Sequence, residues 1–280
     1  MTTPSAARVP LSVPLAGTTL RGVTIGAGRP ALFMHGLGGS VEQAEQLVGP
    51  IGGVRWLLPE ARGHGASPPG GMRPVSIPEL AADALAFAKA SGARSMVAGG
   101  ISLGAAMALH LAACHPGAVR ALVLVRPAWL FAPNPPSLAG YAALSAALRA
   151  GPAPDARTRL LADPSFRSMA ERAPAHAAAL LAWFEHPDPA GAAATIDDLL
   201  ASDPGITASE AAGLEVPTLV LSAAGEEAHP VATAQALADA LPRARLVTVP
   251  PRGGDKPAFL ERLRAAIADF LAKLPADPPN

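Results

Sequence analysis

The sequence predicts an α/β fold in which a mostly parallel sheet lies between layers of helices, and two features support this prediction. Short apolar runs alternate along the 280 residues with segments of helical periodicity. These runs are continuously apolar and lack alternating polar residues, which is typical of strands that helices cover on both faces. Alternating strands and helices favour right-handed crossovers, with ligands bound at the carboxyl ends of the strands.

Each element follows from its local pattern. Strands are expected at six apolar runs, 31–36, 54–63, 95–102, 121–127, 217–224 and 244–250. Helices are expected near 40–48, 77–91, 103–114, 230–240 and 257–273. The second of these helices is preceded by Ser76, with Glu79 three residues later, which is the spacing of a capping box.

The alternation stops after Pro127 and resumes near Pro217. The intervening segment is rich in alanine and interrupted by prolines, which occur in turns and at first helical positions and so predict a cluster of short helices. We therefore expect a core formed by residues 1–127 and 217–280, with residues 128–216 inserted as a helical cap.

Composition limits the class of protein. Half of the residues are apolar, so the chain can bury a substantial core. Lys and Arg total 22, as do Asp and Glu, and this balance gives no overall field that would attract nucleic acid or an acidic membrane. Small neutral partners fit this balance better, so we expect a small-molecule substrate. Prolines or charges interrupt every candidate bilayer span and the N-terminal segment, so we expect a cytoplasmic protein. The lone Cys114 excludes an intrachain disulfide, and the oligomeric state stays open.

The sequence "GISLG", residues 100–104, matches the G-x-S-x-G pattern between a predicted strand and a predicted helix. Its glycines allow a sharp turn that projects the Ser102 hydroxyl beyond the sheet. We interpret Ser102 as a nucleophile. The alternative is a glycine-rich turn whose serine only caps the helix.

A second loop, "HGLGG" at residues 35–39, follows the strand at 31–36. In an acyl-transfer site this loop supplies one oxyanion donor, here the backbone N–H of Leu37, which pairs with that of Leu103. We expect His35 to brace the loop by hydrogen bonds and to have no catalytic role.

These stretches, together with "PEARGHGASP" and "VPTLVLSAAGEEAHPV", resemble the α/β-hydrolase family over nearly the whole chain. The resemblance implies the α/β-hydrolase fold, an eight-stranded and mostly parallel sheet flanked by helices. It also implies an antiparallel hairpin within the first 30 residues and a helical cap after the sixth strand, with substrate between cap and sheet.

The resemblance also implies a catalytic acid. It sets Glu226 at the position where the family usually has aspartate, and Glu227 is a weaker candidate. Relatives that carry the acid after the sixth strand would have it at Arg126, which cannot accept a hydrogen bond from imidazole. A structural ion pair is the expected role of Arg126, and a contact with a substrate anion is the alternative.

The family's catalytic histidine is missing. Asp255 stands at its position, and no histidine follows His229. Reference pKa values of about 3.9 for Asp and 6.5 for His make the carboxylate a weaker base by roughly 3.5 kcal/mol. Burial near Glu226 would raise the pKa of Asp255 and recover part of this difference. We therefore expect Ser102, Glu226 and Asp255 to form an atypical catalytic triad.

Other histidines are candidates for a substitute base. His229 is the best positioned, because it follows Glu226 by three residues. His176 and His186 in the cap could reach the site. Of the remaining histidines, His64 is expected to brace its loop, and His110 and His115 are expected on the helix at 103–114, pointing into packing or solvent.

The favoured function is a hydrolase of a small, largely apolar ester, thioester or lactone. One alternative is a lyase, isomerase or cyclase that uses Asp255 as base, and another is a noncatalytic binding module. The glycine-rich loop lacks the Lys-Ser/Thr ending of a phosphate site and the histidines lack metal-ligand spacing, so no cofactor or metal is expected. Aromatic residues that would line an apolar pocket are Trp129, Phe131, Trp183 and Phe184.

Overall fold

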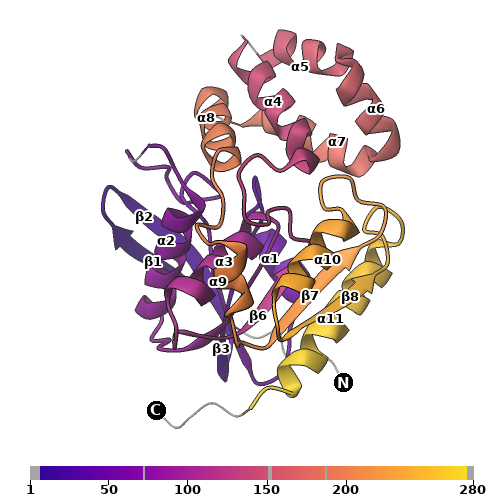
Figure 1. The fold of residues 1–280 in the computed structure, drawn as a ribbon. Coiled ribbons are helices and arrows are strands. Elements are labelled where there is room, and N and C mark those ends of the chain that lie inside the picture. Colours follow the sequence, from indigo (N-terminus) through magenta and orange to yellow (C-terminus); the bar gives the residue numbers. More distant parts are fainter. Residues whose placement is uncertain (1–6, 72, 151–152, 187, 276–280) are drawn as a thin grey trace.

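A computed structural model of the chain describes residues 7–71, 73–150, 153–186 and 188–275 and confirms the predicted α/β fold (Figure 1). One eight-stranded sheet has the order β1-β2-β4-β3-β5-β6-β7-β8. The antiparallel pairs are β1 with β2 and β2 with β4, and the other neighbours are parallel. The strands are β1 (Arg8–Leu15), β2 (Thr18–Gly26), β3 (Arg29–Met34), β4 (Val54–Pro59), β5 (Met96–Ile101), β6 (Val119–Val125), β7 (Thr218–Ala223) and β8 (Ala244–Val249).

Helices cover both faces of this sheet. The helices of the core are α1 (Val41–Val48), α2 (Ile77–Ala90), α3 (Leu103–Cys114), α9 (Ala208–Ala212), α10 (Val231–Ala240) and α11 (Lys256–Ala272). Helices α1 and α11 bury their apolar faces in one core cluster, and α2, α3 and α10 bury theirs in the other. Helix α2 begins with the predicted capping box, because the Ser76 hydroxyl accepts from the Glu79 N–H and the Glu79 carboxylate accepts from the Ser76 N–H.

The chain between β6 and β7 is largely helical and lies above the sheet in Figure 1. Before α9, its elements are η1 (Pro136–Leu138), α4 (Ala139–Arg149), α5 (Ala153–Ala162), α6 (Pro164–Arg172), α7 (Pro174–Leu181), η2 (Ala182–Glu185) and α8 (Pro189–Leu200). Proline occupies the first position of α6, α7 and α8, where its missing N–H costs nothing. Asp163 and Asp188 cap α6 and α8 by accepting backbone hydrogen bonds of 2.9 Å.

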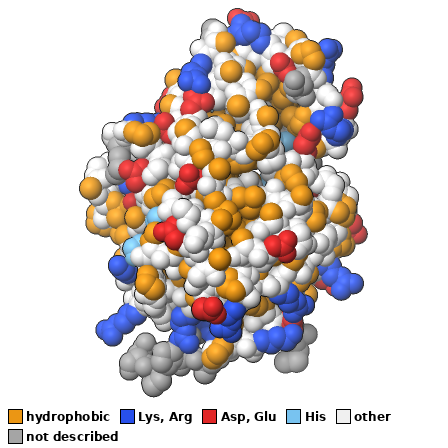
Figure 2. All heavy atoms as spheres, in the orientation of Figure 1, with side chains coloured by type: hydrophobic (Ala, Val, Ile, Leu, Met, Phe, Trp, Pro, Cys, Tyr) orange, Lys and Arg blue, Asp and Glu red, His pale blue; other side chains and the backbone are white. Residues whose placement is uncertain are grey.

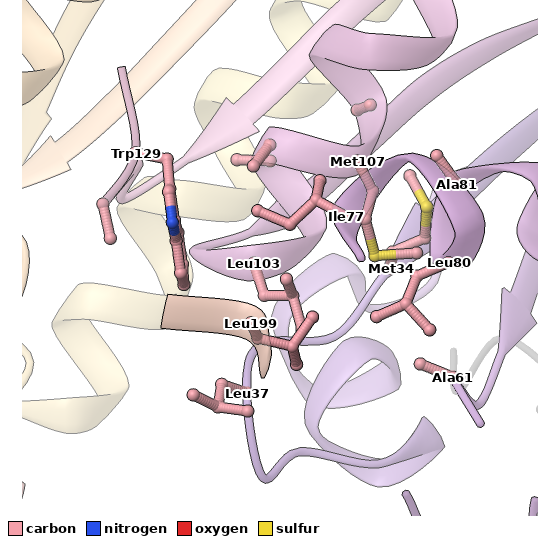
Figure 3. Packing of buried hydrophobic residues seen from close by; sticks show 14 of the residues in the cluster. Met34, Leu37, Ala61, Ile77, Leu80, Ala81, Leu103, Met107, Trp129 and Leu199 are labelled. Atoms are coloured by element: carbon pink, nitrogen blue, oxygen red, sulfur yellow. The ribbon is translucent and has the colours of Figure 1, made fainter. Parts of the chain in front are cut away.

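Helix α8 ties these helices to the sheet. Its residues Ile196 and Leu199 are fully buried in the same cluster as Leu103 of α3, and Figure 3 shows Leu199 and Leu103 among the residues of that cluster. Polar bonds reinforce this packing, because the Asp198 carboxylate accepts from the Arg73 guanidinium at 2.9 Å and from the Val75 N–H at 3.0 Å.

Charged side chains are spread over the surface. On the face in Figure 2, basic and acidic side chains are interspersed among apolar and neutral ones, with several basic side chains near the lower edge. None of the helices in the described part of the chain has the length and apolar character needed to cross a bilayer.

Candidate active site

The turn from β5 to α3 presents Ser102 at the carboxyl edge of the sheet. Ser102 has a φ of 54°, a left-handed conformation that is strained for a residue other than glycine. The turn needs glycines on both sides, because a Cβ on Gly100 would lie 2.4 Å from Gly104 and one on Gly104 would lie 2.2 Å from the Met34 carbonyl oxygen. The Ser102 N–H donates to the Val125 carbonyl at 3.0 Å and so ties the turn to β6.

The loop after β3 lies against this turn. A Cβ built on Gly36 would be 3.5 Å from the Cβ of Ser102. The Gly36 N–H donates to Oε1 of Gln43 at 2.8 Å, which ties the loop to α1. Within the described residues, the next amide, that of Leu37, has no hydrogen-bond partner, and neither does the amide of Leu103. Two free donors therefore flank Ser102 from separate elements.

A cavity of about 380 Å³ opens beside Ser102. Its floor comes from the loops that follow the strands, and its roof comes from α4, α6, α7 and η2. The polar side chains on its wall are Gln43, Ser102, Arg126, Tyr141, Arg172, His176, Glu226, Glu227, His229 and Arg252. The cavity is the right size for a small molecule, and its position between cap helices and sheet is the one that the sequence predicts.

Three of these side chains form a bonded cluster. Arg126 follows β6, with a φ of 48° and its N–H bonded to the Leu221 carbonyl at 2.6 Å. Its guanidinium pairs through Nε with Glu226 and donates from Nη2 to Nδ1 of His229 at 3.0 Å. Nδ1 of His229 is 3.4 Å from the nearer Glu226 oxygen. Arg126 is thus in the expected ion pair, and Glu226 and His229 meet on the cavity wall.

The charges in this cluster are set by burial and pairing. Burial, followed by the positive charge of Arg126, lowers the pKa of His229 from 6.5 to about 4, so the imidazole is neutral at pH 7. Burial acts to raise the pKa of Glu226, but its bond to His229 and the charge of Arg126 outweigh burial and hold that pKa below its ordinary value. The carboxylate is therefore ionised beside a neutral imidazole.

The structure does not bring Asp255 to the cavity. Its carboxylate accepts a hydrogen bond from the Ala258 N–H at 3.0 Å and caps α11, and its side chain is exposed to solvent. Pro251, Arg252 and Gly253 of the same loop line the cavity instead. The predicted contact of Asp255 with Glu226 is absent from the described residues. The physical reason is local, because an Asp just before a helix satisfies a free amide of its first turn.

Among the other histidines, His35 braces the loop after β3, whereas His176 lines the cavity. Nε2 of His35 accepts from the Ala61 N–H at 3.0 Å, so its Nδ1 donates to the Gly36 carbonyl at 2.8 Å and braces the loop as expected. The ring of His64 lies 5.0 Å from that of His35. Burial lowers the pKa of His35 to about 4 and that of His64 to about 3. Among the cap histidines, His176 lines the cavity, whereas His186 bonds to the backbone of Asp188.

One of the four predicted aromatic residues lines the cavity. This residue is Trp183, whose indole packs so closely on Gly38 that a Cβ there would lie 2.4 Å from the ring. Trp129 and Phe184 are buried in the core, and Phe131 packs against it.

Sequence patterns did not reveal the roles of Gln43, Tyr141, Arg172 and Arg252, because each role depends on contacts between distant segments. For Asp255, a signal was available. A helix predicted to begin near 257 has this acid two residues earlier, followed by Lys256 and Pro257, which is typical of a helix cap. The described residues contain no group of three or more His, Cys, Asp or Glu side chains that could hold a metal ion.

Comparison with known proteins identifies the family. The family model of the alpha/beta hydrolase fold matches residues 30–254. A hydrolase from Pseudomonas aeruginosa PA01 is 24% identical, with a TM-score of 0.68, and the match covers 94% of this chain and 98% of that one. An enol-lactonase from Burkholderia xenovorans LB400 is 22% identical, with a TM-score of 0.70 and coverage of 94% and 100%. A thermophilic esterase from Thermogutta terrifontis is 21% identical, with a TM-score of 0.70 and coverage of 96% and 99%. On this evidence the chain belongs to the α/β-hydrolase fold family.

Proposed function

We propose that the chain is a hydrolase that cleaves a small ester, thioester or lactone through an acyl-enzyme on Ser102. The observation that carries the proposal is a strained serine turn that opens onto a cavity beside the two free amides of Leu37 and Leu103. The similar structures described as an enol-lactonase and an esterase support the choice of a carboxylic ester or lactone as substrate.

In this mechanism the Ser102 oxygen attacks the carbonyl carbon while its proton passes to Nε2 of His229. The carbonyl oxygen becomes an oxyanion that accepts hydrogen bonds from the Leu37 and Leu103 amides. The carbon–oxygen or carbon–sulfur bond then breaks, and the leaving group takes the proton from His229. Water repeats the sequence on the acyl-enzyme, releasing the acid and restoring the Ser102 hydroxyl.

Proton transfer requires one tautomer of His229. When Arg126 donates to Nδ1, the neutral ring carries its proton on Nε2 and cannot accept the one from Ser102. When the proton sits on Nδ1 it points to Glu226, and the lone pair on Nε2 is free. Catalysis therefore needs His229 to exchange the bond from Arg126 for one to Glu226, and this requirement favours slow turnover.

Asp255 has a structural role in this proposal, as the cap of α11. Its exposure and its bond to Ala258 favour this role over that of a base. The lyase, isomerase or cyclase alternative depends on Asp255 as base and gains no support from these contacts.

A second candidate is a noncatalytic binding module. The observation in its favour is the Arg126 bond to Nδ1 of His229, because the resulting tautomer leaves no base beside the serine. This candidate keeps the same cavity and ligand chemistry but omits the acyl-enzyme.

Labelling by a fluorophosphonate, together with turnover of 4-nitrophenyl butyrate, separates the two candidates. We expect stoichiometric labelling of the parent, no labelling of Ser102→Ala, and a fall of at least about 10³-fold in kcat for that variant. Ser12→Ala, which changes an exposed serine of β1, is the matched control and should retain both signals. A folded parent that neither labels nor turns over any ester, thioester or lactone would leave the binding module.

A further inference from the structure

The cavity contains more positive than negative charge. Three guanidinium groups line it, and two of them are paired, Arg126 with Glu226 and Arg172 with Glu227, the latter at 2.5 Å. Arg252 has no hydrogen bond or ion pair within the described part of the chain. One positive charge on the wall is therefore left without a protein partner.

A second free donor lies nearby. Tyr141 of α4 lines the same cavity, and its hydroxyl makes no hydrogen bond to any described residue. Burial raises the pKa of Tyr141, whereas the charges of Arg126 and Arg252 act in the opposite direction. The hydroxyl is thus a neutral donor within electrostatic range of the unpaired Arg252. The tyrosine ring lies beside the imidazole of His176, with 5.7 Å between the ring centroids.

We propose that the cavity takes a substrate that carries a carboxylate in addition to its scissile ester or lactone bond, and that Arg252 and Tyr141 bind this carboxylate. A guanidinium fork and a hydroxyl match the two oxygens of a carboxylate, and charge-assisted hydrogen bonds are the stronger kind. This inference rests on the proposed function. It narrows the substrate class to esters or lactones that carry a negative charge, whereas the sequence favoured a largely apolar substrate.

The positions of the lining residues support a substrate whose scissile carbonyl lies at Ser102 and whose carboxylate lies at Tyr141 and Arg252. Ser102 and Leu37 lie on the sheet side of the cavity, whereas Tyr141 belongs to the cap and Arg252 to the loop after β8. The cavity volume of about 380 Å³ lies near the lower end of the range for small-molecule sites and favours a short chain between the carbonyl and the carboxylate. A half-ester of a short dicarboxylic acid, or a lactone with a short carboxylated side chain, meets both requirements.

The test compares two activated esters, mono-4-nitrophenyl glutarate and 4-nitrophenyl pentanoate, which differ by a carboxylate in place of a terminal methyl group. We expect the parent to favour the glutarate ester at least about 10-fold in kcat/KM. Arg252→Gln and Tyr141→Phe should each remove most of this preference, because each lowers kcat/KM for the glutarate ester more than for the pentanoate ester. Arg262→Gln, at an exposed arginine of α11, is the matched control and should keep the preference.

The outcomes separate this inference from the proposed function. Ser102-dependent hydrolysis of both esters at equal kcat/KM would overturn the carboxylate site and leave the hydrolase standing. If neither ester is hydrolysed, calorimetry with glutarate on Ser102→Ala tests the site without turnover. Binding of glutarate that Arg252→Gln abolishes would support the site, and the absence of binding would overturn it.

Discussion

Ser102 and Arg126 stand at the ends of neighbouring strands, and both have positive φ angles, of 54° and 48°. Conformations of this kind cost about 1–3 kcal/mol each and persist where the surroundings enforce them. Here the enforcing contacts are main-chain bonds across the sheet, from Ser102 to Val125 and from Arg126 to Leu221. These bonds hold the two residues where both side chains line the same cavity.

The proposed base predicts an unusual pH profile. Because only neutral His229 accepts a proton, and because its pKa is lowered to about 4, kcat/KM should rise through pH 4 and stay level from about pH 5.5 to 7. An unperturbed histidine would place this rise near pH 6.5. Initial rates for a neutral ester between pH 3.5 and 8 measure the midpoint.

Asp255→Asn is the control for this profile. Asparagine caps a helix about as well as aspartate, so the variant should fold and should keep the midpoint near pH 4. If Asp255→Asn instead abolishes turnover while the protein stays folded, Asp255 is the base and the assignment of His229 is wrong.

At the scale of elements, the loop after β3 depends on one side chain of α1. Gln43 accepts the Gly36 N–H, and the amide of Leu37 follows directly. Gln43→Ala should lower kcat about 10-fold with a smaller effect on KM, because the loop positions a donor that acts on the transition state. The loss of this hydrogen bond should also cost about 1 kcal/mol of unfolding free energy.

Steady-state kinetics and urea unfolding of Gln43→Ala measure both effects. The matched control is Gln46→Ala, which truncates an exposed side chain on the same helix. Equal kcat values for the two variants would show that the loop holds its position without Gln43.

For the whole molecule, two buried histidines predict sensitivity to acid. The folded-state pKa values of His35 and His64, about 4 and about 3, lie below the unfolded value, so the unfolded chain binds more protons below pH 6.5. The unfolding free energy should therefore fall as the pH falls from 7 to 5, by about 2 kcal/mol for each histidine. Urea titrations at the two pH values measure the loss. His64→Gln should reduce the measured loss by about 2 kcal/mol, which is the contribution of that one ring. An unchanged unfolding free energy would contradict the buried, neutral state of these rings.

Much of the fold follows from the sequence because the central strands are buried on both faces. β5 and β7 are fully buried, and their apolar runs were therefore continuous enough to locate within a few residues. The edge strand β1 is largely exposed and contains prolines, so only the family resemblance implied it. Residues 128–216 were predicted as short helices from their prolines, but the order of packing among those helices has no local signal.

The sequence predicted the candidate site only where the functional residues lie close together in the chain. Ser102, with its following amide, and Glu226, with His229 three residues later, are short motifs. Arg252 and Tyr141 are far apart in the sequence, and their proximity depends on how the cap packs over the sheet. For Asp255, the resemblance to the family predicted a catalytic base, whereas its position just before a helix predicted a helix cap. In the structure its carboxylate accepts the Ala258 N–H, as a helix cap does.

The attachment of α8 has a practical consequence for protein engineering. Because Leu199 is buried in the same apolar cluster as Leu103 of α3, and because Asp198 is bonded to Arg73 and Val75, α8 cannot move outward without exposing apolar surface. The other cap helices, from α5 to η2, are held over the cavity by the contact of Trp183 with Gly38 and by the Arg172–Glu227 pair, so any widening of the cavity is expected there. A chimaera that takes its cap helices from another protein should accordingly be joined before Pro189, so that α8 and its contacts with the core stay native.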